Sequence, residues 1–277
     1  MYNNIYFYEE GKQSMKTRLR KRFSLLLVML LVLTMIPVST VRVSAKAATA
    51  TTAAKKMTKK AATKKVTKAK KQRTIFIAAG HQRRGISSTE RLAPGSSRRK
   101  AKLTSGTAGV RTHIPEYKTN LAIAKAAKKE LEKRGYKVIM LRTTNNCPLS
   151  NQQRTKKANK SGADIHICIH CNADGSSAKG PLVCVPGSSR YVGKKIFNSS
   201  RKLGSCLLSS VAKAVNKKSH GTIRSDYYTT INWAKIPTMI LECGFLTNPT
   251  EDRQLNSASY QKKLAKGIAN GVDKYFK

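Results

Sequence analysis

Short apolar runs alternate with longer amphipathic stretches from residue 74 to residue 277. Runs rich in β-branched residues, typical of buried strands, are residues 74–79, 136–141, 163–173, 181–186 and 238–243. Apolar residues at helical spacing mark residues 116–135, 149–161, 191–216 and 258–276. Strands that alternate with helices form βαβ units, so the pattern predicts an α/β fold. We expect a single domain whose mainly parallel, twisted sheet carries helices on both faces.

Residues 82–115 interrupt this alternation with Ser, Gly, Arg and Lys and show no clear apolar period. A structureless loop of this length inside a compact domain is usually functional or mobile. Because it follows the first predicted strand, we expect it to border the functional site and to cover a substrate groove.

A different pattern occupies the N-terminal part of the chain. The basic residues 16–22 precede an apolar run, residues 23–38, and residues 43–45 (Val-Ser-Ala) place small side chains where a signal peptidase cleaves. The apolar run is shorter than the roughly 20 residues of a membrane-spanning helix. We therefore predict that residues 1–45 contain a secretory signal peptide cleaved near Ala45, which leaves no stable membrane span; a retained anchor is the alternative.

Residues 46–73 are rich in Lys, Ala and Thr and contain no Asp or Glu. Charge repulsion and the lack of apolar surface predict a disordered linker there. The chain carries 55 Lys and Arg against 13 Asp and Glu, a formal charge of +42, which favours a polyanionic partner. For a secreted, wall-associated protein, that partner is an anionic wall polymer such as teichoic acid, bound through the linker and the basic surface. A solvated spacer is the alternative.

A nucleic-acid-binding protein would also have a lysine-rich segment. That hypothesis leaves the signal peptide unexplained, and any chain of charge +42 binds DNA in a salt-sensitive way. We therefore expect no specific nucleic acid partner, and we expect a monomer.

Six cysteines in a secreted chain raise the question of disulfides. Cys168, Cys184 and Cys243 lie inside apolar strand-like runs, where a free cysteine packs as a small apolar residue. Cys168 and Cys171 would point to opposite faces of one strand. We predict buried, unpaired thiols.

Four chemically versatile residues map to one edge of the predicted sheet. His81 follows the first strand, Glu116 begins the first helix, and His170 and Glu242 stand near the ends of later strands. In parallel sheets, sites form beyond the carboxyl ends of the strands. Two imidazoles and one carboxylate give zinc three ligands and leave a fourth position for water, as in catalytic zinc sites. A second carboxylate can then transfer the proton of that water. The pattern predicts a zinc hydrolase.

Five blocks of the sequence, in this order, resemble zinc-dependent N-acetylmuramoyl-L-alanine amidases, most of all exported cell-wall enzymes of clostridia-like Gram-positive bacteria. The blocks are IFIAAGHQ, GTAGVRTHIPEYKTNLAIA, ELEKRGYKVIMLRTT, ADIHICIHCNA and INWAKIPTMILECGFLTNPTED. The resemblance covers essentially all of residues 74–277 and implies a zinc amidase catalytic domain there.

This resemblance implies hydrolysis of the amide between the muramyl lactyl group and the first L-alanine of peptidoglycan. It also implies roles for single residues: His81, Glu116 and His170 correspond to the zinc ligands, and Glu242 corresponds to the catalytic acid/base. The family usually carries an aspartate two or three residues before its Gly-His histidine, where this chain has Ala78. If that aspartate orients the histidine, its loss lowers metal affinity by the ~10–100-fold typical of such partners.

Two other hypotheses stay open. The first is a catalytically silent wall-binding protein that binds peptidoglycan or teichoic acid. The second, on the site residues alone, is a zinc carboxypeptidase or another metallohydrolase. His166 lies on the same strand face as His170 but four residues earlier, so we expect it to be a core histidine or a partner of the site.

Overall fold

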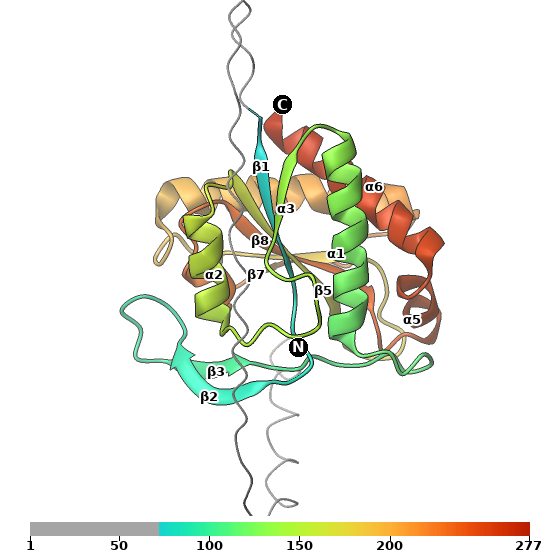
Figure 1. Cartoon of the computed structure of the whole chain (residues 1–277), viewed down its shortest axis with the longest axis horizontal. Coiled ribbons are helices and arrows are strands. Elements are labelled where there is room, and N and C mark those ends of the chain that lie inside the picture. Colours follow the sequence, from blue (N-terminus) through green and yellow to red (C-terminus); the bar gives the residue numbers. More distant parts are fainter. Residues whose placement is uncertain (1–71) are drawn as a thin grey trace, which may run out of the picture. The chain divides into compact units, whose positions relative to one another are not determined.

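The computed structural model describes residues 72–277 and has the predicted order of strands and helices (Figure 1). The predicted strands are β1 (Thr74–Ala79), β4 (Lys137–Met140), β5 (Ile165–Asn172), β6 (Leu182–Val185) and β8 (Thr238–Phe245). The predicted helices are α1 (Glu116–Lys133), α2 (Asn151–Lys160), α3 (Gly193–Val215) and α6 (Ala258–Phe276). The predicted signal peptide and nearly all of the basic linker lie outside the described residues.

One sheet of six strands, in the order β4-β1-β5-β8-β6-β7, forms the centre of the fold. Neighbouring strands are parallel except β6 and β8, which are antiparallel. The prediction of a mainly parallel sheet is confirmed. The edge strand β7 (Gly221–Arg224) was not predicted, because its four residues are half-buried at most and give no apolar run.

Two apolar clusters cover the two faces of the sheet. On one face, residues such as Ile77 and Ile167 pack against α1, α3 and α6. On the other, alternate residues of the same strands, such as Ala78 and Cys168, pack with Ala158 of α2 and Ile231 of α4 (Thr229–Asn232). The helices therefore lie on both faces, as their amphipathic patterns predicted.

The prediction of a structureless loop over residues 82–115 is wrong. That segment contains an antiparallel hairpin of β2 (Ile86–Arg91) and β3 (Arg99–Leu103), beside the carboxyl end of β1 (Figure 1). Its strands are built mainly from Ser, Thr, Arg and Lys, whose side chains are exposed or half-buried, so they carry no apolar alternation. The hairpin is attached to the domain where the Trp233 indole donates to the Arg91 carbonyl and Leu92 is buried.

Two short helices were also missed, α4 and α5 (Pro249–Leu255). The signal for α5 is present in the sequence: the Asn248 side chain caps the helix by accepting from the amides of Thr250 and Glu251, and Pro249 opens it. Seven residues are too few for a helical apolar period to stand out.

All six cysteines are buried and unpaired, as predicted. Cys168 belongs to the apolar cluster beside α2, and Cys171 belongs to the cluster on the opposite face. Within residues 72–277, no helix combines the length and the apolar content that a membrane crossing requires.

Candidate metal and catalytic site

His81 stands where the chain leaves β1. Its backbone is left-handed, with φ of 57°, and the Gly80 amide donates to the Ile169 carbonyl of β5 at 2.8 Å. Gly80 is required there because a Cβ would lie 2.2 Å from Cε1 of the His170 ring. The left-handed backbone at His81 thus turns its imidazole out of the strand. Gly80, which has no side chain, lets the His170 imidazole pack against the backbone.

Glu116 is the first residue of α1, and its side chain is buried. A carboxylate is favoured at a helix N-terminus, where the backbone amides are unpaired. One carboxylate oxygen accepts from Asn120 Nδ2 at 2.9 Å and from the Cys171 amide at 3.2 Å, and the other accepts from the Thr107 amide at 3.2 Å. These bonds aim the carboxylate at the end of β5.

The loop before Glu116 is fixed by a buried carboxylate of α5. Asp252 accepts hydrogen bonds from the Arg111 and Thr112 amides at 2.7 and 2.8 Å and from the Thr112 hydroxyl at 2.6 Å. Burial opposes its charge, but these hydrogen bonds hold the pKa of Asp252 below its ordinary value. The ionised carboxylate therefore anchors the chain that delivers Glu116.

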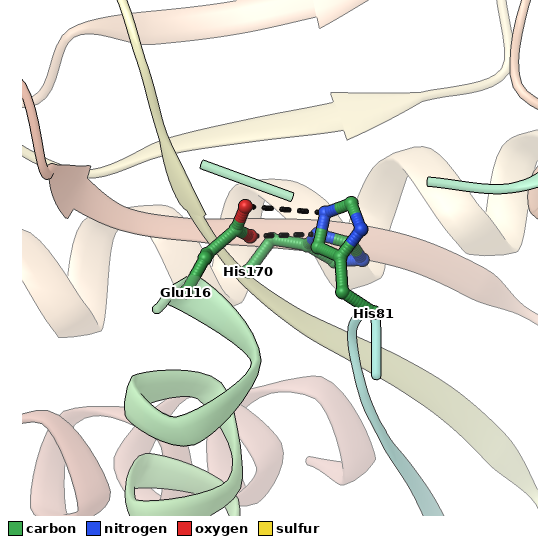
Figure 2. Close-up of side chains that lie close together, drawn as sticks. All are labelled: His81, Glu116 and His170. Carbon is green, nitrogen blue, oxygen red and sulfur yellow. Dashed lines mark hydrogen bonds and ion pairs between the residues drawn. The ribbon is translucent and has the colours of Figure 1, made fainter. Parts of the chain in front are cut away.

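Figure 2 shows the two imidazoles converging on the Glu116 carboxylate. His81 Nε2 lies 3.2 Å from one oxygen, and His170 Nδ1 lies 3.2 Å from the other. One ligand atom from each of the three residues lies within 4.8 Å of the others. The sequence placed these residues on one rim, and the structure brings them together.

The protonation of His81 suits a metal ligand. Its Nδ1 lies 2.8 Å from the Thr104 carbonyl, which can only accept a hydrogen bond, so Nδ1 carries a proton. In the neutral ring this leaves the lone pair on Nε2, which faces Glu116 and His170. A metal-bound histidine usually has its other nitrogen held in this way. Two imidazoles and one carboxylate are a donor set that zinc prefers, so the residues present fit that ion.

Without a metal, the three groups shift one another's protonation. Burial opposes charge on Glu116, but His81 and His170 hold the pKa of its carboxyl well below the ordinary value. Burial also lowers the pKa of His81, but the Glu116 charge outweighs it and the net pKa is raised. For His170, burial prevails and the pKa is lowered.

Glu242 lies beside this cluster on the neighbouring strand. It is the register partner of His170 across the parallel β5–β8 pair, and its side chain is buried. Its Oε2 atom has no hydrogen-bond partner. Burial, together with the charge of Glu116, raises the pKa of the Glu242 carboxyl well above the ordinary value. A carboxyl whose pKa is raised in this way is suited to proton transfer.

His166 is a core histidine, one of the two roles predicted for it. It is fully buried, and burial lowers its pKa to about 3, so the ring is neutral. Its Nε2 lies 3.1 Å from the Cys168 sulfur.

Two buried arginines near the site were missed. Arg142 donates to the carbonyls of Ala79, Gly80 and Tyr117 at 2.8–3.0 Å and so fixes the backbone that carries His81. Arg154 donates to the His81 carbonyl at 3.2 Å. Among 55 basic residues, no sequence signal separates these two from solvated ones.

Comparison with known proteins identifies the family. The chain matches the family model for N-acetylmuramoyl-L-alanine amidase over residues 75–274. It is 28% identical to the amidase LytC of Bacillus subtilis over 163 residues, which is 58% of this chain and 31% of LytC. It is 31% identical to the uncharacterized protein YqiI of the same species over 157 residues, covering 57% of this chain and 72% of YqiI.

A solved structure agrees with these matches. The N-acetylmuramoyl-L-alanine amidase of Clostridium difficile 630 superposes with a TM-score of 0.60 at 28% identity, covering 74% of this chain and 97% of that chain. These comparisons support N-acetylmuramoyl-L-alanine amidase function on peptidoglycan and confirm the resemblance read from the five sequence blocks. Since the matched region spans most of its length, the chain belongs to the N-acetylmuramoyl-L-alanine amidase family.

Proposed function

We propose that this protein is a zinc-dependent amidase that cleaves the bond between the muramyl lactyl group and L-alanine of peptidoglycan. His81, Glu116 and His170 hold the zinc ion, and Glu242 is the catalytic acid/base. The observation that carries the proposal is the cluster of three ligand atoms within 4.8 Å, with Nε2 of His81 left free by the Thr104 carbonyl.

A zinc ion held by these three residues would polarise the amide carbonyl and make water a stronger acid. The chain supplies the proton transfers. Glu242 takes the proton of the attacking water and delivers it to the nitrogen of the leaving L-alanine. Its Oε2 has no competing hydrogen-bond partner within the described residues, so it is available for both steps. Glu116 and Glu242 are themselves buried, so their charges act through a medium of lower dielectric constant than water.

The test of this function is product analysis on purified peptidoglycan. We expect the protein to release stem peptides with new L-alanine amino termini, to lose this activity after chelation, and to regain it with added zinc. A zinc carboxypeptidase would instead release single C-terminal residues. If the protein binds zinc one to one but releases no stem peptides, the silent wall-binding alternative is favoured. Release of stem peptides that chelation does not affect would contradict zinc dependence.

We also propose that the protein is secreted and acts at the cell wall as a monomer, with residues 46–73 binding anionic wall polymers. We expect a chain lacking these residues to sediment less with purified walls at low ionic strength, and the difference to disappear at high salt. Walls stripped of teichoic acid are the control, since both chains should bind them equally. Equal retention on intact walls would contradict the role of the linker. The mass in solution tests the monomer, whose expected value is 30.5 kDa for the whole chain.

A further inference from the structure

A small hollow lies beneath the two histidines of the site, between the sheet and α2. The space between its lining atoms, counted together with the solvent at its open mouth, is about 260 Å³. Its lining comprises Ala78, Gly80, His81, Asn151, Arg154, His166, Cys168, His170 and Thr230. The side of the hollow formed by β1 carries only the methyl group of Ala78.

The guanidinium of Arg154 lines this hollow and lacks an acidic partner. The residue is only 4% exposed. It donates one hydrogen bond from each nitrogen, to the carbonyls of Leu149, His81 and Cys147 at 2.9–3.2 Å. A guanidinium has five N–H groups, so two remain. None of the ion pairs among residues 72–277 includes Arg154.

The surrounding groups do not supply the missing negative charge. The two side chains of β5 that line the hollow beside His170 are the buried thiol of Cys168 and the buried imidazole of His166, and neither is a carboxylate that could pair with Arg154. The nearby Arg142 is also positive, only 4% exposed, and bonded only to carbonyls. Asn151, which lines the hollow, begins α2, and a helix N-terminus adds partial positive charge. A buried charge without a counter-charge is costly, so the site favours an anion.

We propose that the hollow binds a small monovalent anion, the size of formate or a halide, as the counter-ion of Arg154. The two remaining N–H groups of the guanidinium donate to the anion, and the methyl of Ala78 leaves room for it. Because Arg154 also donates to the His81 carbonyl, the bound anion steadies the residue that begins the metal site. This binding does not depend on zinc or on amidase activity.

The test measures thermal unfolding of the whole chain after chelation, in sodium formate and in sodium gluconate of equal ionic strength. Gluconate is too large for the hollow. Formate at tenfold its Kd should raise Tm by about 3–5 °C, and at higher concentrations the rise should grow with the logarithm of the formate concentration. Ala78→Asp places a tethered carboxylate beside Arg154. In gluconate this variant should therefore have a higher Tm than the natural chain, and formate should not raise its Tm further.

Ala78→Asn is the matched control, because it fills the same volume without a charge. It should lose the formate response and unfold at a lower Tm than Ala78→Asp. Equal Tm values for the two variants would mean that filling, not charge, matters, and would overturn the proposal. So would an unchanged Tm of the natural chain in formate, or an equal rise in Ala78→Asp.

A second measurement uses only the natural chain, so it applies even if Ala78→Asp or Ala78→Asn does not fold. Crystals of the natural chain soaked in bromide should show an anomalous peak within hydrogen-bonding distance of Arg154 in the hollow. Bromide peaks confined to the outer surface would overturn the proposal.

Discussion

Glu242→Gln should lower kcat by about 10²–10⁴-fold, the usual contribution of a positioned acid/base, while zinc content and fold are retained. Glutamine has the same shape as glutamate but cannot accept a proton from water and return it to the leaving amine. The substitution should be tolerated structurally, because Oε2 has no hydrogen-bond partner to lose. Burial also raises the pKa of this carboxyl in the metal-free protein, so its ionised form does not stabilise the fold. Turnover on peptidoglycan and bound zinc per chain are the measurements.

Glu251 provides a matched control for this result. It is also buried, but its carboxylate accepts from the Gly180 and Phe245 amides and from the Lys217 ammonium. Glu251→Gln should therefore lower the free energy of unfolding by about 1–3 kcal/mol and leave kcat of the folded fraction nearly unchanged. If Glu242→Gln keeps full turnover, or if both variants lose activity only in proportion to unfolding, Glu242 is not the acid/base.

The sequence predicts those parts of the fold that have an apolar run or an apolar period. β1 has the predicted bounds because its continuous apolar run is buried on both faces of the sheet, and α6 has them because every third to fourth residue is apolar and lies in a core cluster. The hairpin of β2 and β3 escapes prediction because its strands are polar, and its position depends on tertiary contacts such as the bond from Trp233 to the Arg91 carbonyl. Such contacts join residues more than a hundred positions apart.

The same distinction applies to the site. His81, Glu116 and His170 could be placed on one rim because parallel strands have their carboxyl ends at one edge. The residues that hold them could not be found in this way. Arg142, Arg154 and the Thr104 carbonyl act through backbone groups, and hydrogen bonds to backbone carbonyls leave no mark in a residue pattern.

His170→Ala should abolish stoichiometric zinc binding and, with it, amidase activity. Two ligands would remain, and the loss in affinity should exceed the ~10–100-fold that removing a ligand's hydrogen-bond partner costs. The protein should stay folded, since His170 is partly exposed and packs on Gly80 at the rim rather than in the core. Zinc per chain after dialysis, measured beside circular dichroism, separates metal loss from unfolding. His220→Ala, at an exposed histidine, is the control that should keep both zinc and activity.

The dependence of zinc affinity on pH tests the same ligand set in the natural chain. Zinc binds neutral imidazole, so protons compete with it. Glu116 raises the pKa of metal-free His81 in spite of burial, above the ordinary histidine value of about 6.5. Zinc affinity should therefore be highest above that raised pKa and should fall as the pH drops through it. This fall should begin at a higher pH than it would for a free imidazole. Glu116→Gln removes both a ligand and the source of this shift, so the residual affinity should be weaker and its decline should move to lower pH. If zinc affinity declines over the same pH range in Glu116→Gln as in the natural chain, Glu116 does not act on His81. Unchanged zinc affinity in His170→Ala would exclude His170 as a ligand.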